Sequence, residues 1–234
     1  MKRDNWVSFL PYYLLVLILG IGIAYAGERS VNSLSTTSAD VQEHCFIIDA
    51  GHGGIDGGAT SCTGVLESQL NLEIAVRLND LFRFMGYETV MIRTTDTSIY
   101  TSGNTIAAQK LSDLKERVRI VNKQEKNILI SLHQNTFSDK KYSGAQVFYS
   151  PTDGSKTLAD TVQSALVTVL NPGSRRTAKK GEGIYLLQHI ERPGILIECG
   201  FLSNAEEEAL LRSDTYQKKL CSVIASSVAR GICT

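Results

Sequence analysis

The sequence lacks an excess of charge of either sign, because 24 lysine and arginine residues balance 24 aspartate and glutamate residues in a chain of 234. A chain without net charge lacks the basic surface typical of nucleic-acid-binding proteins, so we expect no nucleic-acid partner. Internal repeats and low-complexity tracts are also absent. The hydrophobic fraction of 43% is ordinary for a globular protein, and the length suits one substantial domain behind a leader.

Cysteine is too scarce and too irregularly spaced for a disulfide scaffold. The five cysteines are odd in number, which excludes a framework that pairs them all, and no C-x-x-C motif occurs. Cys45, Cys199 and Cys221 lie in apolar runs and are predicted to be small buried hydrophobic side chains. Whether Cys62 and Cys233 pair with each other is left open by the sequence.

Common phosphate-binding and nucleophile motifs are missing as well. A glycine-rich stretch at residues 51–58 follows an apolar run, but Asp56 occupies the third glycine position of a dinucleotide-binding fingerprint. No Gly-Lys-Ser/Thr follows it, which excludes a P-loop, and the absence of G-x-S-x-G disfavours a serine hydrolase. The glycines are better explained as a tight turn around His52.

The N-terminus differs from the rest of the chain. Lys2 and Arg3 precede a nearly uncharged apolar run at residues 9–26, which ends in the small-x-small pattern Ala24-Tyr25-Ala26 of a signal-peptidase site. We therefore predict that residues 1–27 form a signal peptide or an N-terminal membrane anchor. The basic end stays in the cytoplasm, so the remainder is exported, and it is secreted if the leader is cleaved.

Residues 28–43 are polar and lack apolar periodicity, which predicts a linker, and residues 44–234 form the folded domain. Short apolar runs alternate there with helical periodicity, and residues 94–110 are expected to form a loop at the rim of a cleft. The expected strands are 45–50, 87–93, 127–133, 145–149, 184–188 and 194–198, and the expected helices are 67–85, 112–124, 158–169 and two that begin near 203 and 215. This alternation predicts an α/β fold, a single domain with a mostly parallel, roughly six-stranded sheet and helices on both faces.

Three chemically reactive side chains fall at strand ends. His52 lies just past the first strand, and His133 and Glu198 end two later strands, so all three are expected at the carboxyl edge of one sheet. Glu67 begins a helix, where a carboxylate alone is often only favourable to the helix dipole. Together with the two histidines, Glu67 completes a ligand set that suits catalytic zinc and leaves a coordination position open. Glu198 is then the candidate general base, and Asn135 is a candidate for orienting a ligand or a substrate carbonyl.

The remaining histidines have no comparable setting. His44 sits at the linker end, and His189 lies beside charged residues, so both are expected at the surface, and the alternative that His189 lines the cleft stays open.

Four ordered motifs give the chain a family resemblance. They are Ile48-Asp49-Ala50-Gly51-His52-Gly53-Gly54, Glu67 with Leu70-Asn71-Leu72, Ser131-Leu132-His133-Gln134-Asn135, and Glu198-Cys199-Gly200-Phe201-Leu202-Ser203-Asn204. Over residues 45–232 the chain resembles the zinc-dependent N-acetylmuramoyl-L-alanine amidases of the amidase 3 type. The resemblance implies that His52, Glu67 and His133 bind one zinc ion and that Glu198 is the catalytic glutamate.

The same resemblance marks candidate substrate contacts and some departures. Arg117 matches the family's Leu-x-x-Arg segment, and Gln188 stands where an arginine is frequent, a change that bears on how a peptide carboxylate is held. Ala50 replaces a usual proline, Gln134 a usual alanine, and Cys199 a usual aliphatic residue or glycine. None of these changes removes a ligand, so the resemblance implies an active enzyme.

The implied reaction is hydrolysis of the amide between N-acetylmuramic acid and L-alanine in peptidoglycan. A single catalytic domain behind a leader resembles the sporulation branch of the family, whose germination-specific amidase prepares spore-cortex peptidoglycan for muramic-δ-lactam formation. Peptidoglycan is then the substrate, a separate protein is expected to target or activate the domain, and an uncleaved leader would bind the membrane. The implied location is the cell wall or the outer face of the membrane, including the forespore cortex.

Two alternatives stay open at this point. One is a zinc peptidase that cleaves within the stem peptide. The other is an inactive wall-binding or activator protein on an amidase scaffold, which the intact set of four residues disfavours.

Overall fold

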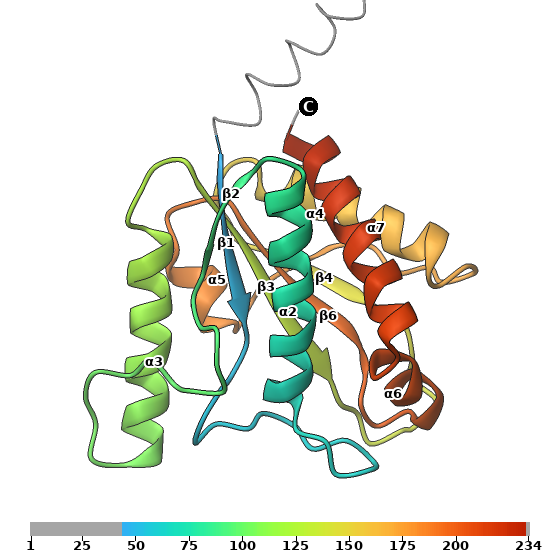
Figure 1. The fold of residues 1–234 in the computed structure, drawn as a ribbon, viewed down its shortest axis with the longest axis horizontal. Coiled ribbons are helices and arrows are strands. Elements are labelled where there is room, and N and C mark those ends of the chain that lie inside the picture. The colour runs from blue at the N-terminus through green and yellow to red at the C-terminus, as the bar shows by residue number, and fades with distance from the viewer. Residues whose placement is uncertain (1–43, 233–234) are drawn as a thin grey trace, which may run out of the picture. The chain divides into compact units, whose positions relative to one another are not determined.

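The apolar runs become the strands of a six-stranded sheet within residues 44–232, the part of the chain that the computed structural model describes. The strands are β1 (Cys45–Ala50), β2 (Glu88–Met91), β3 (Asn127–Asn135), β4 (Gln146–Tyr149), β5 (Lys179–Lys180) and β6 (Gly194–Phe201). Their order in the sheet is β2-β1-β3-β6-β4-β5 (Figure 1). β1, β2, β3 and β6 are parallel, whereas β4 runs antiparallel to β6 and pairs in parallel with β5. The predicted mostly parallel α/β sheet is confirmed.

The expected leader (residues 1–27) and linker (residues 28–43) lie outside the described residues. Within residues 44–232, no helix combines the length and the apolar character that crossing a membrane requires.

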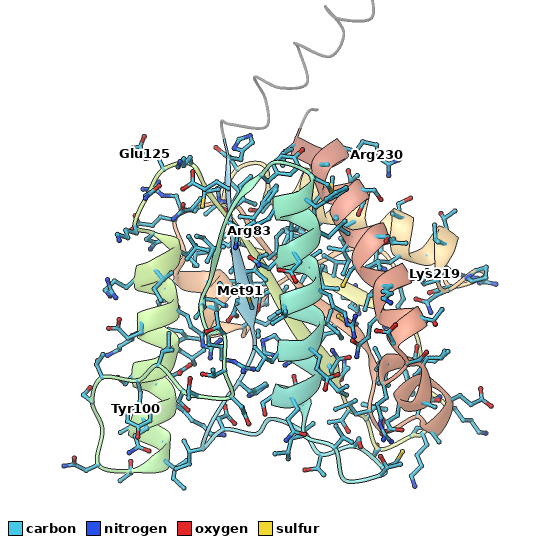
Figure 2. The ribbon with its side chains drawn as sticks, in the orientation of Figure 1. Arg83, Met91, Tyr100, Glu125, Lys219 and Arg230 are labelled. Carbon is cyan, nitrogen blue, oxygen red and sulfur yellow. The ribbon has the colours of Figure 1, made fainter. Side chains whose placement is uncertain are left out.

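Helices cover both faces of the sheet (Figure 1). One face carries α2 (Glu67–Phe84), α4 (Ser155–Val169) and α7 (Asp214–Ile232), the other carries α3 (Ile106–Val121) and α5 (Tyr185–His189), and α6 (Ala205–Leu211) follows β6. Helix α7 illustrates how an amphipathic helix packs in this fold, with its apolar side buried and its charged side exposed. Leu220, Ile224 and Val228 are buried against the neighbouring elements, whereas Lys219 and Arg230 are exposed on its outer side (Figure 2).

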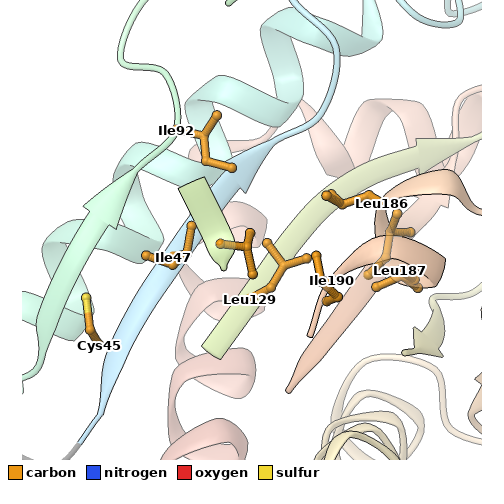
Figure 3. Close-up of a cluster of buried hydrophobic side chains, with 9 residues drawn as sticks. Cys45, Ile47, Ile92, Leu129, Leu186, Leu187 and Ile190 are labelled. Atoms are coloured by element: carbon orange, nitrogen blue, oxygen red, sulfur yellow. The ribbon is translucent and has the colours of Figure 1, made fainter. Parts of the chain in front are cut away.

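Alternate residues of the central strands face opposite layers. Phe46 of β1 packs against Phe82 of α2, with ring centroids 4.4 Å apart. Ile47, the next residue, belongs to a buried cluster with Val121 of α3 and Leu187 of α5 (Figure 3). Because successive side chains of a strand point to opposite faces, β1 is apolar on both sides, as a strand in the middle of a covered parallel sheet must be.

Some predicted elements are wrong in type or in boundary. The predicted strand at residues 184–188 is the short helix α5. Helix α3 begins at Ile106, not near residue 112, so the predicted loop at 94–110 is shorter. Thr105 caps that helix by accepting a hydrogen bond from the backbone N–H of Ala108, 3.2 Å away. The helix expected to begin near residue 203 is α6, which begins at Ala205 and is capped by Asn204.

Strand register places the reactive side chains. His133 of β3 is paired in parallel with Glu198 of β6, and Asp49 of β1 is paired with Ser131 of β3. Residues paired in this way point to the same face of the sheet. His133 and Glu198 therefore stand side by side at the carboxyl end of the sheet, on the face that α3 and α5 cover.

Candidate metal centre and active site

The turn after β1 presents His52. Its backbone φ is 63°, the single positive value among the non-glycine residues that the structure describes. This left-handed conformation costs a non-glycine residue roughly 1–2 kcal/mol, so the surrounding structure must hold it. Gly53 and Gly54 also have positive φ, and Gly53 and Asp56 exchange two backbone hydrogen bonds that close the turn. The sequence prediction of a tight glycine turn around His52 is confirmed.

The carboxylate of Glu67, at the first position of α2, is held from several sides. Its Oε2 accepts from the backbone N–H of Ala59 at 2.9 Å, and its Oε1 accepts from the N–H of Gln134 at 3.1 Å and from the side-chain amide of Asn71 at 3.3 Å. Burial alone would raise the pKa of Glu67, but hydrogen bonds and charge from His133 and His52 hold it far below its ordinary value. Glu67 is therefore an ionised, fixed acceptor facing both imidazoles.

His133 approaches the same carboxylate from β3. Its Nδ1 lies 3.1 Å from Glu67 Oε1, and the Nε2 of His52 lies 3.3 Å from that oxygen. The ring of His133 passes over Gly51, where an added Cβ would lie 2.2 Å from two ring atoms. Only glycine at position 51 leaves room for this imidazole.

Three ligand atoms thus converge, one each from His52, Glu67 and His133, and all lie within 4.8 Å of one another. Two imidazole nitrogens and one carboxylate oxygen are the donors of a three-ligand zinc site with an open position. Among the described residues, Glu198 does not belong to this group of converging ligand atoms. The donor set and spacing fit a metal ion, and Glu198 remains free for another role.

Glu198 stands beside this group with an unused oxygen. Within residues 44–232, its Oε2 is buried and has no hydrogen-bond partner. Burial, and then the charge of Glu67, raise the pKa of Glu198 above its ordinary value, although His133 and His52 oppose the shift. A buried carboxylate without a partner is costly unless a ligand or a reacting group completes its surroundings.

Two residues that sequence reasoning missed support His52. Asp56 Oδ2 lies 2.9 Å from His52 Nδ1, and the ammonium group of Lys110 lies 2.7 Å from Asp56 Oδ1. Burial lowers the pKa of His52, but Glu67 and then Asp56 outweigh it and raise that pKa to about 9. A carboxylate on the far nitrogen of a ligating histidine fixes its ring and tautomer. An acidic residue four positions after the histidine was the available sequence clue.

A pocket of about 300 Å³ opens beside the three converging residues. Its lining includes His52, His133 and Lys110 together with the segment Gly183–Leu186. That segment comprises the approach to α5 and its first turn, which the sequence prediction assigned to a strand. The pocket gives a substrate access to the group that the ligand atoms form.

The predicted substrate contacts are placed differently from one another. Arg117 reaches the pocket but is only 2% exposed and is hydrogen-bonded within the protein. Asn135 is half-buried at the end of β3, outside the pocket lining. Gln188 is exposed on α5 and lines a separate hollow with Lys180. Of the predicted site residues, the structure thus brings together His52, Glu67, His133 and Glu198.

The other histidines and the cysteines agree with their predictions where they are described. His189 is exposed, and His44 is partly exposed at the start of the described chain. Cys45, Cys199 and Cys221 are buried and free. Cys62 is exposed and free, and the partner suggested for it, Cys233, lies outside the described residues.

Several known proteins are similar to this chain in sequence and in fold. Residues 46–232 match the family model Amidase_3, described as N-acetylmuramoyl-L-alanine amidase. A germination-specific N-acetylmuramoyl-L-alanine amidase of Bacillus subtilis is 36% identical over 233 residues, which cover 99% of this chain and 94% of that protein. The CwlD amidase from Clostridioides difficile, solved in complex with the GerS lipoprotein, matches with a TM-score of 0.77 and 36% identity over 81% of this chain and 98% of that chain. The amidase AmiC2 of Nostoc punctiforme matches with a TM-score of 0.70 and 25% identity over 82% of this chain and 98% of that chain.

Proposed function

Because the chain belongs to the N-acetylmuramoyl-L-alanine amidase family and is an enzyme of that activity, we propose that it cleaves peptidoglycan with one zinc ion bound by His52, Glu67 and His133 and with Glu198 as the catalytic base. The observation that carries the proposal is the convergence of the three ligand atoms within 4.8 Å beside a carboxylate oxygen that has no partner in residues 44–232. The scissile bond is the amide between N-acetylmuramic acid and L-alanine.

The chemistry divides between the ion and the protein. Bound zinc supplies Lewis-acid chemistry, activating water and polarising the carbonyl of the scissile amide. Glu198 takes a proton from the attacking water and returns it to the leaving amine. Burial raises the pKa of Glu198 above its ordinary value, and a shift in this direction favours a carboxyl group that must both accept a proton and release it again. Asp56 holds the ring of His52 in place while this occurs.

The pocket beside His133 accommodates the groups flanking the scissile amide. Lys110 is its partly exposed cation, and Asn135 at the end of β3 remains our candidate for orienting the substrate carbonyl. Contact between Gln188 and a peptide carboxylate stays a prediction, which requires the substrate to extend from the pocket to the separate hollow that Gln188 lines.

We further propose a role in spore germination. The Bacillus subtilis relative, matched over 99% of this chain, is germination-specific, and this supports hydrolysis of cortex peptidoglycan as the first step towards muramic-δ-lactam. Such a role places the mature enzyme outside the cytoplasm, in the cell wall or at the outer face of the membrane. Muropeptide mass spectrometry of spores from a strain lacking this protein should show no muramic-δ-lactam, and a normal amount would refute this role.

A protein partner is part of the proposal. The CwlD structure contains the GerS lipoprotein, which supports an activating or targeting protein for this chain as well. Pull-down from native membranes should recover such a partner. Full activity of the isolated protein, together with recovery of no stable partner, would argue against it.

The catalytic assignment is tested by two substitutions with matched controls. Glu198→Ala should retain one equivalent of zinc and lose turnover of purified peptidoglycan, whereas His133→Ala should lose both. Glu125→Ala and His44→Ala replace residues of the same types that line neither the pocket nor the Gln188 hollow, and they should change neither measurement.

The products and the metal content separate the alternatives. Mass spectrometry should detect free lactyl ends on muramic acid. Shortened peptides on intact muramic acid would indicate a stem-peptide peptidase, and a wild-type chain that never binds zinc would indicate an inactive wall-binding or activator protein. Full turnover by Glu198→Ala would refute the proposed base.

A further inference from the structure

The backbone that carries His52 depends on side chains from elsewhere in the fold. Buried backbone carbonyls require hydrogen-bond donors. At this turn three consecutive carbonyls, those of Ala50, Gly51 and His52, receive donors from two arginine side chains, Arg93 and Arg117. The two arginines come from different parts of the chain, and both are at most 3% exposed.

Arg93, two residues after β2, joins the turn to α2. Its Nε donates to the carbonyl of Ala50 at 2.8 Å, and its Nη2 donates to the carbonyls of Gly51 at 3.1 Å and Ser68 at 2.8 Å. Ser68 follows Glu67 in the first turn of α2. One guanidinium group therefore fixes the turn of one candidate ligand against the helix start that carries another.

Arg117 reaches the same turn from α3. Its Nη1 donates to the carbonyl of Ala50 at 3.1 Å, and its Nη2 donates to the carbonyl of His52 at 2.8 Å. Asp49 and Asp113 pair with the guanidinium group, with Asp113 Oδ2 accepting from Nε at 2.5 Å. The carbonyl of Ala50 thus accepts from both arginines, and the turn is held between them.

The third ligand is connected through Asp49. The carboxylate oxygen of Asp49 that does not face Arg117 accepts a hydrogen bond from Ser131 Oγ at 2.7 Å. Ser131 lies two residues before His133 and on the same face of β3. A continuous set of hydrogen bonds thereby links Arg117 to the strand that positions His133.

We propose that Arg93 and Arg117 form an arginine brace, a pair of positioning residues that sets the geometry of His52, Glu67 and His133 for metal binding. The inference rests on the proposed function and deepens it. In this proposal Arg117 supports the site instead of contacting the substrate, because its Nε, Nη1 and Nη2 all donate to groups of the protein. Arginine is required because a planar fork bonds several acceptors at once, whereas the ammonium group of lysine acts as a point charge.

The test replaces each arginine by lysine, which keeps the charge and removes the fork. Arg93→Lys and Arg117→Lys should each bind zinc about 10–100-fold more weakly, the usual consequence of losing a residue that orients a metal ligand. The zinc dissociation constant is measured by competition with a chelator, and circular dichroism of the metal-free protein checks the fold. The controls are Arg83→Lys on α2 (Figure 2) and Arg119→Lys on α3, both exposed in the native chain, and their zinc affinity should equal that of the wild type.

The outcome is separable from the amidase activity, because zinc binding is measured without substrate. Folded lysine variants that bind zinc as tightly as the wild type would overturn the brace. If a lysine variant does not fold, Asp113→Asn takes its place, since it is isosteric, removes the charge that faces Arg117 and keeps an amide oxygen that can accept from the backbone N–H of Ile99. Unchanged zinc affinity in that variant would overturn the brace too. A wild-type chain that binds zinc but does not cleave peptidoglycan would refute the proposed function and leave the brace standing.

Discussion

Gly51→Ala is expected to weaken metal binding strongly without replacing any of the three proposed ligands. A Cβ at this position would lie 2.2 Å from Cε1 and Nε2 of His133 and 2.7 Å from its Cδ2. Non-bonded carbon atoms settle at about 3.5 Å or more, so the imidazole must retreat by roughly 1.3 Å. Metal–ligand distances tolerate changes of only about 0.2 Å, and the displaced nitrogen therefore leaves the coordination sphere.

The size of the effect differs between metal affinity and stability. Losing the correct position of one ligand should weaken zinc binding by about 100-fold or more, beyond the usual effect of changing a residue that merely orients a ligand. The metal-free protein should lose only about 1–3 kcal/mol of unfolding free energy, the typical cost of overpacking a buried site. Chelator competition gives the first quantity, and urea denaturation of the metal-free protein gives the second.

Gly57→Ala is the matched control in the same loop. Its added Cβ would meet the flexible end of Leu66, 3.2 Å away, and that side chain can shift without disturbing a ligand. Zinc affinity in this variant should stay at the wild-type level. Wild-type zinc affinity in Gly51→Ala would show that His133 does not occupy the position described, and the reasoning about the site would fail with it.

Two further predictions concern buried groups around the site. Asp49→Asn should lower the unfolding free energy by about 3 kcal/mol at neutral pH, because it leaves a buried guanidinium group without one of its ionic partners. Burial opposes the shift, but the charge of that guanidinium holds the pKa of Asp49 below its ordinary value. The stability it contributes is therefore present above the unfolded-state pKa of about 3.9 and disappears as the pH falls through the lower folded-state value. Denaturation curves at neutral and acidic pH measure this, and an equal loss at both would contradict it. Separately, a thiol reagent should label Cys62 in the native protein and leave the buried Cys199 unmodified until denaturant is added, since burial raises the pKa of that thiol. Mass spectrometry of labelled peptides checks this, and rapid native labelling of Cys199 would contradict it.

The chemical residues of the site could be predicted from the sequence because regular elements present them. His133 and Glu198 follow continuous apolar runs, and such runs predict buried parallel strands whose carboxyl ends meet. Glu67 begins a helix with strong apolar periodicity. What the sequence could not supply was the register, and the pairing of His133 with Glu198 is what places the proposed base beside the proposed ligands.

Short and polar elements were less predictable. The run Ile184–Gln188 is too brief for periodicity to separate strand from helix, and the structure resolves it as α5 with Leu186 and Leu187 both buried. The first turn of α3 has no buried residue, so the buried apolar periodicity begins only later in the helix and the Thr105 cap marks its start. Long-range hydrogen bonds such as those of Arg93 have no sequence pattern, because their acceptors are backbone carbonyls.

The proposed site has two parts that differ in how well the sequence predicts them. The proposed ligands and the proposed base lie on β3, β6, the start of α2 and a turn held between two arginines, where burial and pairing constrain both sequence and geometry. The pocket wall at residues 183–186 lies on a short helix and its approach, outside the sheet. Changes in that wall can alter which groups enter the pocket without moving a ligand atom. The proposed ligands and base are therefore presented by the sheet, the turn after β1 and the start of α2, whereas part of the pocket wall lies on the segment that was hardest to predict.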